Sequence, residues 1–448
     1  MKKLFGTDGV RGVANDGLTP LLAFELGRAG AYVLTKHTTT TKVLVAKDGR
    51  RSGDMLEAAL TAGLCSIGAE VHQCGIIPTP AVAFLIKKYG FDAGVMISAS
   101  HNPMEDNGIK FFDSQGLKLP DQLEAQIEEI IATQTLLPTP TGKDVGTVHT
   151  FDAVDDYVSF LVSTVPNLRF DGKRVVLDCA NGATSAIAQH VFEALGATVH
   201  AMHNSPDGCN INANCGSTHM ESLVAYVKEN GADIGIAFDG DGDRMLAVDN
   251  NGKIIDGDII MAICGLDLFK RDKLPGGTIV ATVMSNMGLE VFCRKHGMNL
   301  YRAAVGDRYV LEKMLADDLP LGGEQSGHMI FREYNTTGDG ILAGVQLLSV
   351  LQRSGKTMSE LASICEVFPQ VLINVKVPSG RMSELATNPS ILQKQSEIEA
   401  LFEQDDRLLL RPSGTEPLVR VMLEGRDKIK VQSLAEELAA VIEAELGQ

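Results

Sequence analysis

The sequence predicts an α/β protein in which three related mixed α/β domains precede a smaller α+β domain at the C-terminus. An apolar strand, a short polar loop, an amphipathic helix and a second strand recur in that order three times. Such alternation favours parallel βαβ units. The pattern changes near residue 368, and a chain of 448 residues is long enough for three or four domains.

Each repeat predicts its elements at defined positions. Strand, helix and second strand are predicted at 43–46, 55–66 and 70–72 in the first copy, at 175–178, 185–195 and 198–200 in the second, and at 279–282, 289–296 and 299–301 in the third. The copies begin at irregular intervals, which argues against a solenoid. They predict domains at 1–150, 151–255 and 256–367.

The remaining residues, 368–448, predict the α+β domain. Its strands are predicted at 371–377, 408–410 and 418–423, and a closing helix is predicted near 427–446. Boundaries inferred from a pattern of this kind are accurate to within several residues.

The composition argues against several classes of protein. Hydrophobic residues make up 44% and charged residues 22%, as in ordinary globular proteins, and no apolar run approaches the length of a membrane span. A net charge of −17 argues against a nucleic-acid partner, so local Arg and Lys side chains must attract any anionic substrate. The eight cysteines form no Cys-x-x-Cys pair and no signal peptide is recognisable, which predicts a reducing, cytoplasmic location.

The second repeat leads from an apolar strand at 234–238 into Asp239, Asp241 and Asp243, three aspartates at alternate positions. Hard oxygen ligands suit Mg2+, Mn2+ or Ca2+ rather than Zn2+. Asp-Gly pairs also form plain turns, but carboxylates this close repel one another unless a cation neutralises them. A calcium-binding EF-hand loop fits less well, because Arg244 stands where its glycine would. A catalytic or substrate-bridging Mg2+ is therefore predicted.

The first repeat leads to a loop that contains Ser100 and His101, and Lys110 lies ten residues after the serine. The loop lacks the Gly-x-Ser-x-Gly elbow of a triad hydrolase. A helix N-cap is the structural alternative for Ser100. The functional hypothesis is a serine that carries a phosphate, whose oxygens could complete the coordination of an adjacent Mg2+. Lys110 could neutralise that phosphate or transfer a proton.

The third repeat leads to a glycine-rich loop that contains Glu324, Ser326 and His328. Glycines let a ligand approach the backbone closely. A carboxylate beside a hydroxyl suits vicinal sugar hydroxyls or the ammonium group of an amino sugar. On its own this is a weak indication, since glycine-rich loops with a glutamate are common.

The C-terminal domain offers a phosphate cradle between its second and third strands. Guanidinium groups, hydroxyls and main-chain amides suit phosphate, although a plain polar hairpin is the alternative. The candidates are Arg411, Ser413, Gly414, Thr415 and Arg420. Near the N-terminus, Arg11 lies in a glycine-rich turn, where it could reach a phosphate or only pair with an acid such as Asp8.

These four loops, in this order, resemble those of the α-D-phosphohexomutase superfamily. The match runs from Phe-Gly-Thr-Asp-Gly at 5–9 to Arg-Pro-Ser-Gly-Thr-Glu-Pro at 411–417 and so spans the whole chain. Any one loop would be a modest indication, whereas four in register are very specific.

Within the superfamily, the chain is most similar to the bacterial branch that acts on glucosamine phosphates. The residues behind this narrower resemblance lie at 9–15, 305–310 and 323–328. Hexose-phosphate relatives commonly have Met where Gln325 stands. We hypothesise that the carboxylate of Asp307 favours the ammonium of an amino sugar over a hydroxyl.

The resemblance implies four domains around a central active-site cleft, and phosphoryl transfer through Ser100. Mg2+ would be held by the three aspartates and the phosphoserine. Glucosamine 6-phosphate, a small-molecule partner, would bind with its phosphate in the C-terminal cradle and its ring hydroxyls on Glu324 and Ser326. Glucosamine 1,6-bisphosphate would be the intermediate, and glucosamine 1-phosphate would supply UDP-N-acetylglucosamine synthesis.

The resemblance also assigns expected roles around the transferred group. Arg244 would neutralise its charge, and Lys110, His101 and His328 are the acid–base candidates. A homodimer is a further expectation. The alternatives are a phosphoglucomutase or phosphomannomutase of the same superfamily, a silent sugar-phosphate-binding protein, and a Mg2+-dependent phosphatase.

Overall fold

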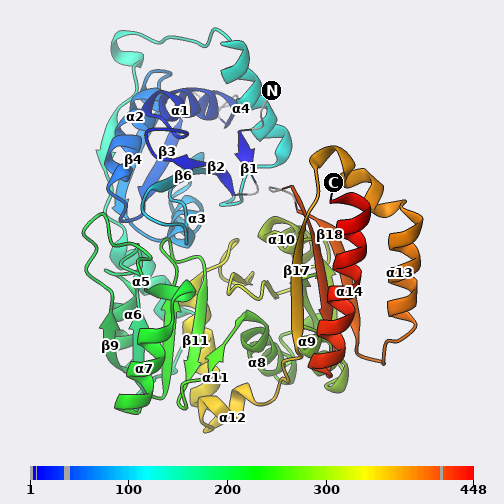
Figure 1. Ribbon diagram of the computed structural model, residues 1–448. Helices are drawn as coiled ribbons and strands as arrows, with labels where there is room; N and C mark the ends of the chain where they lie inside the picture. Colours follow the sequence, from blue (N-terminus) through cyan, green and yellow to red (C-terminus); the bar gives the residue numbers. More distant parts are fainter. Residues whose placement is uncertain (1–3, 7, 35–40, 414–416, 448) are drawn as a thin grey trace. The chain divides into compact units, whose positions relative to one another are not determined.

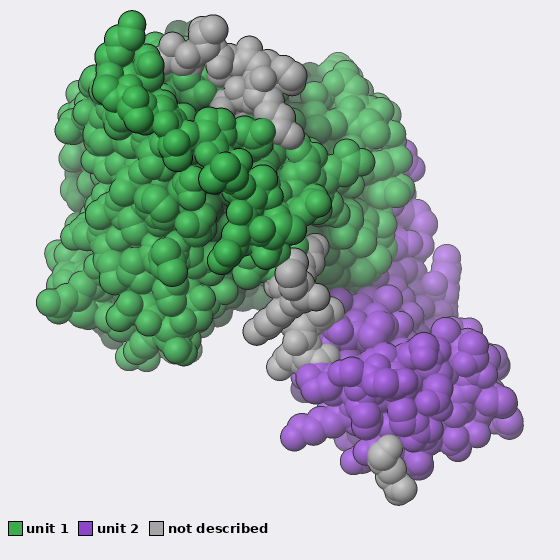
Figure 2. Space-filling model, turned by 90° about the horizontal axis from the view of Figure 1, so that it is seen from above, with its two compact units in different colours: residues 1–284, 301–363 green, residues 285–300, 364–448 purple. Residues whose placement is uncertain are grey.

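The structure is a computed structural model that describes residues 4–6, 8–34, 41–413 and 417–447 (Figure 1). Its contacts group the chain into two compact units. Unit 1 consists of residues 1–284 and 301–363, and unit 2 consists of residues 285–300 and 364–448 (Figure 2). None of the helices in the described ranges combines the length and the apolarity that crossing a membrane requires.

A mixed sheet of seven strands forms the N-terminal part of unit 1. Its order is β1 (Phe5–Gly6), β2 (Gly9–Val13), β6 (Asp106–Asp113), β5 (Ala93–Ile97), β3 (Lys42–Lys47), β4 (Glu70–Ile76) and β7 (Val148–Thr150). The last four strands pair in parallel, and the first three add an antiparallel side that the sequence repeats did not predict.

Helices cover both faces of this sheet (Figure 1). They are α1 (Pro20–Leu34), α2 (Ser52–Cys65), α3 (Thr79–Tyr89) and α4 (Asp121–Thr133). Val43 and Val45 of β3 are buried in the core that α1, α2 and α4 close, because alternate residues of a strand face the same side of a sheet. Gly94 of β5 lies on the other side, against Val82 and Ile86 of α3. The first predicted repeat is confirmed.

The second repeat forms a five-stranded sheet in unit 1. Its order is β12 (Ile254–Ile255), β11 (Met245–Asp249), β10 (Ile234–Phe238), β8 (Arg174–Asp178) and β9 (Thr198–Met202). Its helices are α5 (Val154–Ser163), α6 (Ala188–Ala194) and α7 (Glu221–Asn230). The helix predicted at 185–195 begins later, because residues 183–187 form turns. There the main chain makes hydrogen bonds of the i to i+3 type, such as that from Ile187 N to the Thr184 carbonyl at 3.0 Å.

The third repeat forms a four-stranded sheet in the order β14 (Asn299–Ala303), β13 (Thr278–Thr282), β15 (Leu321–Gly323) and β16 (Met329–Phe331). In unit 1, α8 (Gly257–Lys270) precedes the strands of this sheet, and α10 (Asp307–Ala316), α11 (Gly340–Ser354) and α12 (Met358–Ala362) come later in the chain. The helix of the repeat, α9 (Met287–Lys295), belongs to unit 2, where Asn286 donates to the Phe368 carbonyl at 3.0 Å. The four predicted domain limits stay a prediction.

Unit 2 also contains an antiparallel sheet in the order β17 (Gln370–Lys376), β19 (Leu418–Glu424) and β18 (Arg407–Pro412), with α13 (Pro389–Glu399) and α14 (Lys428–Leu446). Ile391, Val421 and Leu438 share its core. The three strands and the closing helix are confirmed, whereas α13 lies where no element was predicted.

Candidate active site

The three aspartates lie in a tight turn between β10 and β11. All three are buried, and each offers a carboxylate oxygen within 4.8 Å of the others. Gly242 permits the turn, because its φ of 71° is left-handed. Its amide donates to the carbonyl of Asp239 at 3.1 Å. Gly240 brings this loop against the carbonyl oxygen of Ser100, which a Cβ at position 240 would meet at 2.6 Å.

Ser100 follows β5 and has a buried side chain. Its φ of 54° is left-handed, a conformation that non-glycine residues rarely adopt and that is enriched at functional sites. The hydroxyl donates to Asp239 Oδ2 at 2.5 Å, and His101 Nδ1 lies 3.4 Å from the same hydroxyl oxygen. The N-cap alternative is wrong, because the loop leads into strand β6 rather than into a helix.

A buried arginine fixes the loop that carries the serine. The guanidinium of Arg50 donates to four main-chain carbonyl oxygens of residues 100–106, including those of Ser100 at 2.9 Å and Asn102 at 2.8 Å. Asp48 Oδ2 accepts from the guanidinium Nε at 2.9 Å. This pair was not predicted from the sequence, although its place just after β3, at a carboxyl end of the sheet, was an available indication.

Lys110 of β6 is buried and neutralises two acids of the site. Its Nζ lies 2.7 Å from Asp241 Oδ2 and 2.9 Å from Asp8 Oδ2. Burial alone would lower the pKa of Lys110, but the charges of Asp241 and Asp8 raise it above its ordinary value, so the amine stays protonated. The hydroxyl of Thr79, a residue that was not predicted from the sequence, donates to the same Asp241 oxygen at 2.6 Å.

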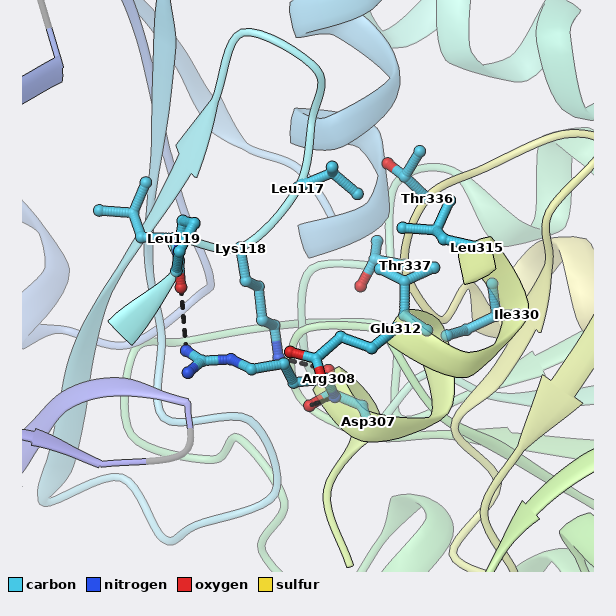
Figure 3. Close-up of a pocket in the computed structure, with 12 residues that line it drawn as sticks. Leu117, Lys118, Leu119, Asp307, Arg308, Glu312, Leu315, Ile330, Thr336 and Thr337 are labelled. Carbon is cyan, nitrogen blue, oxygen red and sulfur yellow. Dashed lines mark hydrogen bonds and ion pairs between the residues drawn. The ribbon is translucent and has the colours of Figure 1, made fainter. Parts of the chain in front are cut away.

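A second lysine, partly buried and also missed from the sequence, links Asp8 to Asp307. Lys118 Nζ lies 2.5 Å from Asp8 Oδ1 and 2.6 Å from Asp307 Oδ2, and Figure 3 shows its side chain pointing toward Asp307 at the start of α10. Asp8 also pairs with Arg11, as one alternative predicted. Burial would raise the pKa of Asp8, but these cations and Lys110 hold it well below its usual value. Asp307 therefore already faces a cation of the chain itself.

The turn that carries Glu324 and Ser326 connects β15 to β16. The amide of Met245, at the start of β11, donates to the carbonyl of Gly327 at 3.1 Å. This bond places the turn beside the aspartate loop. Ser326 is exposed and Glu324 is half-buried, which leaves both side chains accessible to a ligand.

His328 and Arg244 flank Asp243. His328 Nδ1 lies 3.6 Å from Asp243 Oδ2, and its Nε2 lies 3.4 Å from Asp307 Oδ2. Burial would lower the pKa of His328, but its hydrogen bond to Asp243 and the charge of Asp307 raise it. Arg244 donates from its main-chain amide to Asp239 Oδ1 at 3.1 Å, and its Nε lies 3.9 Å from Asp243 Oδ1.

The three acid–base candidates differ in the direction in which their pKa values are shifted. Burial, together with the charges of Arg244 and Arg11, lowers the pKa of His101 to about 4, so this imidazole is neutral at neutral pH. The pKa values of Lys110 and His328 are shifted in the opposite direction. The structure thus separates candidates that the sequence left equal.

The aspartate loop fits a hard divalent cation. Asp241 Oδ1 and Asp243 Oδ1 are buried and accept no hydrogen bond from the residues that the structure describes. Burial and the charges of Asp243 and Asp241 raise the pKa of Asp239 well above its usual value. Buried carboxylates that repel one another are stabilised by a cation, and clustered carboxylate oxygens suit Mg2+ or Ca2+. The donor set therefore fits the predicted metal site.

Unit 2 carries the described part of the predicted phosphate cradle. Arg411 of β18 lies directly opposite Arg420 of β19 in the sheet register. Burial and the charge of Arg420 lower the pKa of Arg411. Like charges directly opposite each other destabilise a sheet, and a bound anion would relieve that repulsion. Ser413 follows β18, whereas Gly414 and Thr415 lie outside the described residues.

Family models match the chain along its length. Their description is phosphoglucomutase/phosphomannomutase, with alpha/beta/alpha domain I over residues 2–137, domain II over 155–252, domain III over 256–368 and the C-terminal domain over 372–441. The predicted α/β class is therefore confirmed by the architecture and by these matches.

Known proteins match over the same length. A phosphoglucosamine mutase from Acetivibrio thermocellus is 56% identical over 450 residues, and one from Thermoanaerobacter sp. (strain X514) is 55% identical over 448 residues; each match covers 100% of both chains. A solved phosphoglucomutase/phosphomannomutase family protein from Burkholderia thailandensis has a TM-score of 0.81 at 25% identity, covering 99% of this chain and 98% of its own. This chain belongs to the phosphoglucomutase/phosphomannomutase family, on its phosphoglucosamine mutase branch.

Proposed function

We propose that this protein interconverts glucosamine 6-phosphate and glucosamine 1-phosphate through a phosphate carried on Ser100. The observation that carries the proposal is the buried Ser100 hydroxyl, held 2.5 Å from Asp239 Oδ2 at the edge of a three-carboxylate cluster. The relatives named phosphoglucosamine mutase support both the reaction and the amino-sugar substrate.

In the first half-reaction, the bond between Ser100 Oγ and phosphorus breaks while a bond forms between phosphorus and O1 of glucosamine 6-phosphate. The O1 proton passes to a base, and Ser100 Oγ takes a proton and becomes a hydroxyl again. Glucosamine 1,6-bisphosphate then reorients within the site without leaving it. The bond between its 6-phosphoryl phosphorus and O6 then breaks while a bond forms to Ser100 Oγ. The Ser100 hydroxyl gives its proton to a base, O6 gains a proton, and glucosamine 1-phosphate leaves.

The chain's own residues contribute mainly position and charge, as is usual in phosphoryl transfer. Lys110 is the proposed acid, because its acidic neighbours keep a proton on its Nζ. His101, neutral and 3.4 Å from Ser100 Oγ, accepts rather than supplies a proton at neutral pH. His328, whose Nε2 accepts from the Gly338 amide at 3.0 Å and whose Nδ1 faces Asp243, orients the Asp243 carboxylate.

The proposed metal is one Mg2+ held by the three aspartates and a phosphate oxygen on Ser100, where it would supply a Lewis acid that draws negative charge from the phosphoryl group. Arg244 lies beside the same carboxylates. Burial would lower its pKa, but the charges of Asp243 and Asp239 raise it, so the guanidinium stays charged and attracts the transferred group.

The sugar and its non-transferred phosphate bind through the remaining residues. Glu324 and Ser326 are proposed to hold the ring hydroxyls, and Asp307 to favour the amino group. The phosphate is proposed to bind in the cradle formed by Arg411, Ser413, Gly414, Thr415 and Arg420. The opposed guanidinium groups of Arg411 and Arg420 support an anion site there.

Initial rates on glucosamine, glucose and mannose 6-phosphates test the assignment, measured on the purified protein with Mg2+. We expect the highest kcat/KM for glucosamine 6-phosphate, with the 1-phosphate as product. A higher kcat/KM for glucose or mannose 6-phosphate would favour the phosphoglucomutase or phosphomannomutase alternative. Release of inorganic phosphate without any 1-phosphate would favour the phosphatase.

A further inference from the structure

A second cluster of potential metal ligands lies in unit 1, in loops at the end of the second sheet. Asp178 is the last residue of β8, His203 follows β9, and Cys215 precedes a short turn of helix. One ligand atom from each side chain lies within 4.8 Å of the others. Asp178 and Cys215 are buried, whereas the His203 side chain is 29% exposed.

Two polar atoms of this cluster lack ordinary partners, whereas Cys215 Sγ accepts from Asn181 Nδ2 at 3.9 Å. Asp178 Oδ2 and His203 Nδ1 lie 3.0 Å apart, yet neither makes a hydrogen bond of normal geometry with any described residue. The other carboxylate oxygen of Asp178 accepts from the Ala180 amide at 2.9 Å. A fully buried carboxylate oxygen without a hydrogen bond is costly. Two atoms this close that do not bond to each other are arranged like ligands of a shared third atom.

A simple ion pair with a protonated His203 is the competing explanation. Such an ion pair would align the imidazole N–H with the carboxylate, but His203 Nδ1 and Asp178 Oδ2 do not have hydrogen-bond geometry. An ion pair also gives no role to the neighbouring thiol of Cys215.

We propose that Asp178, His203 and Cys215 bind a second divalent cation, of the Zn2+ class. One carboxylate, one imidazole and one thiolate form a mixed O, N and S donor set that suits Zn2+, whereas Mg2+ prefers oxygen ligands alone. Three protein ligands leave the fourth tetrahedral position for water, which can enter on the exposed side of His203. Coordination replaces the thiol proton of Cys215 with the metal and releases that proton to solvent.

The site is connected to the Ser100 loop through one asparagine. The amide of Asn212, three residues before Cys215, donates to the Ala180 carbonyl at 2.9 Å. The side chain of Asn212 donates to the carbonyl oxygens of Ser100 at 2.9 Å and Asn102 at 3.0 Å. A cation that ties the loop of Asp178 to the loop of Cys215 therefore braces the segment that supports the serine. This role is structural and separate from the proposed Mg2+ of the aspartate loop.

Cobalt substitution tests the site on the full-length protein, with saturating Mg2+ present to occupy the aspartate loop. Co2+ bound to a thiolate gives a ligand-to-metal charge-transfer band that Co2+ bound to carboxylates cannot give. We expect one equivalent of Co2+ to produce this band and Zn2+ to displace it. Cys215→Ser should abolish the band, His203→Gln should weaken Co2+ binding by at least about tenfold, and Cys209→Ser, at an exposed cysteine outside the cluster, should leave the band intact.

A second measurement on the unmodified chain guards against a variant that fails to fold. Because Cys215 is buried, the measurement is made in a urea concentration at which Cys215 of the metal-free protein is alkylated. Under these conditions Zn2+ should slow alkylation of Cys215, read by mass spectrometry of its peptide, without protecting Cys209. Absence of the cobalt band in the wild-type protein, its persistence in Cys215→Ser, or equal alkylation of Cys215 with and without Zn2+ would each overturn the proposal.

Discussion

The hydroxyl of Ser100 donates a hydrogen bond to Asp239 Oδ2 at 2.5 Å, although 139 positions separate the two residues in the chain. The serine loop follows β5 of the first sheet, and the aspartate loop follows β10 of the second. A phosphate on this hydroxyl would add negative charge beside three buried carboxylates. The proposed phosphoserine and the proposed cation therefore require each other.

Removing one carboxylate should stabilise the metal-free protein. Asp239→Asn keeps an oxygen that can accept from Ser100 but removes a charge that is buried beside two like charges. In EDTA we expect the variant to be more stable than wild type by about 1–2 kcal/mol, and to gain less stability when Mg2+ is added. Thermal unfolding with and without Mg2+ measures both effects.

Asp249→Asn, at a buried aspartate of the adjacent strand β11 that lies outside the cluster, is the control. An Asp239→Asn protein that responds to Mg2+ like wild type would contradict the metal assignment.

Arg50 should act on the reaction by positioning the serine. Arg50→Lys keeps the charge but loses the planar fork that binds four carbonyl oxygens of the loop. We expect kcat to fall roughly 100-fold while KM changes little, because small displacements of a reacting group cost about that much. The neighbouring Arg51 is exposed, so Arg51→Lys should keep near-normal rates and stability within about 0.5 kcal/mol. Equal kcat values for the two variants would show that Arg50 does not position the serine.

Asp339 should make stability depend on pH. Burial raises its pKa from 3.8 to about 6, against hydrogen bonds from Leu342 and Tyr157 that lower it. The folded state therefore binds the proton more tightly than the unfolded state, so this contribution is full below pH 3.8 and is lost as the pH rises toward 6. A shift of two units corresponds to about 3 kcal/mol.

The Asp339→Asn variant should lack this pH dependence. Its free energy of unfolding relative to wild type should rise by up to about 3 kcal/mol between pH 4 and pH 6.5, measured by urea titration. Asn keeps an oxygen that can cap α11 through the Leu342 amide, so the other effects of the change are independent of pH. In Asp171→Asn, a change at an exposed position, the free energy of unfolding should depend on pH as it does in wild type. Parallel pH profiles of wild type and Asp339→Asn would exclude the shifted pKa.

Asp307 should influence the choice of sugar. Asp307→Asn removes a carboxylate that lies 2.6 Å from Lys118 Nζ and is proposed to favour the amino group. We expect the ratio of kcat/KM for glucosamine 6-phosphate over glucose 6-phosphate to fall by about tenfold, since hydrogen bonds to charged groups contribute about 1.5–3 kcal/mol. Lys118→Met is the matched variant, because it frees the same carboxylate and should not lower that ratio. If Asp307→Asn leaves the ratio unchanged, the carboxylate serves only to hold Lys118.

The sequence was sufficient for features that are local in the chain. The repeats were predictable because apolar strands and amphipathic helices carry their periodicity in a few consecutive residues. The aspartate trio and Ser100 were recognisable because their residue types cluster within short loops. The helix α13 and the late start of α6 were not predicted, since both depend on turns and packing that the apolar pattern does not encode.

The sequence was insufficient where a residue's role comes from distant contacts. Nothing in the local sequence distinguishes Arg50 and Thr79 from other polar residues. Their roles come from contacts with Ser100 and Asp241, which form only in the folded chain. The neutral state of His101 requires burial near Arg11 and Arg244, which lie far away in the sequence. The homodimer and the cytoplasmic location stay predictions.

A single-turnover chase of the phosphoryl group tests the central claim most directly. The protein is first labelled with a radioactive phosphate on Ser100, the position is verified by peptide mass spectrometry, and unlabelled glucosamine 6-phosphate is then added in the presence of Mg2+. The account predicts that the label leaves Ser100 within the first turnover and appears in glucosamine 1,6-bisphosphate and then in glucosamine 1-phosphate. Label that remains on Ser100 while glucosamine 1-phosphate accumulates, or a Ser100→Ala protein with full mutase activity, would contradict it.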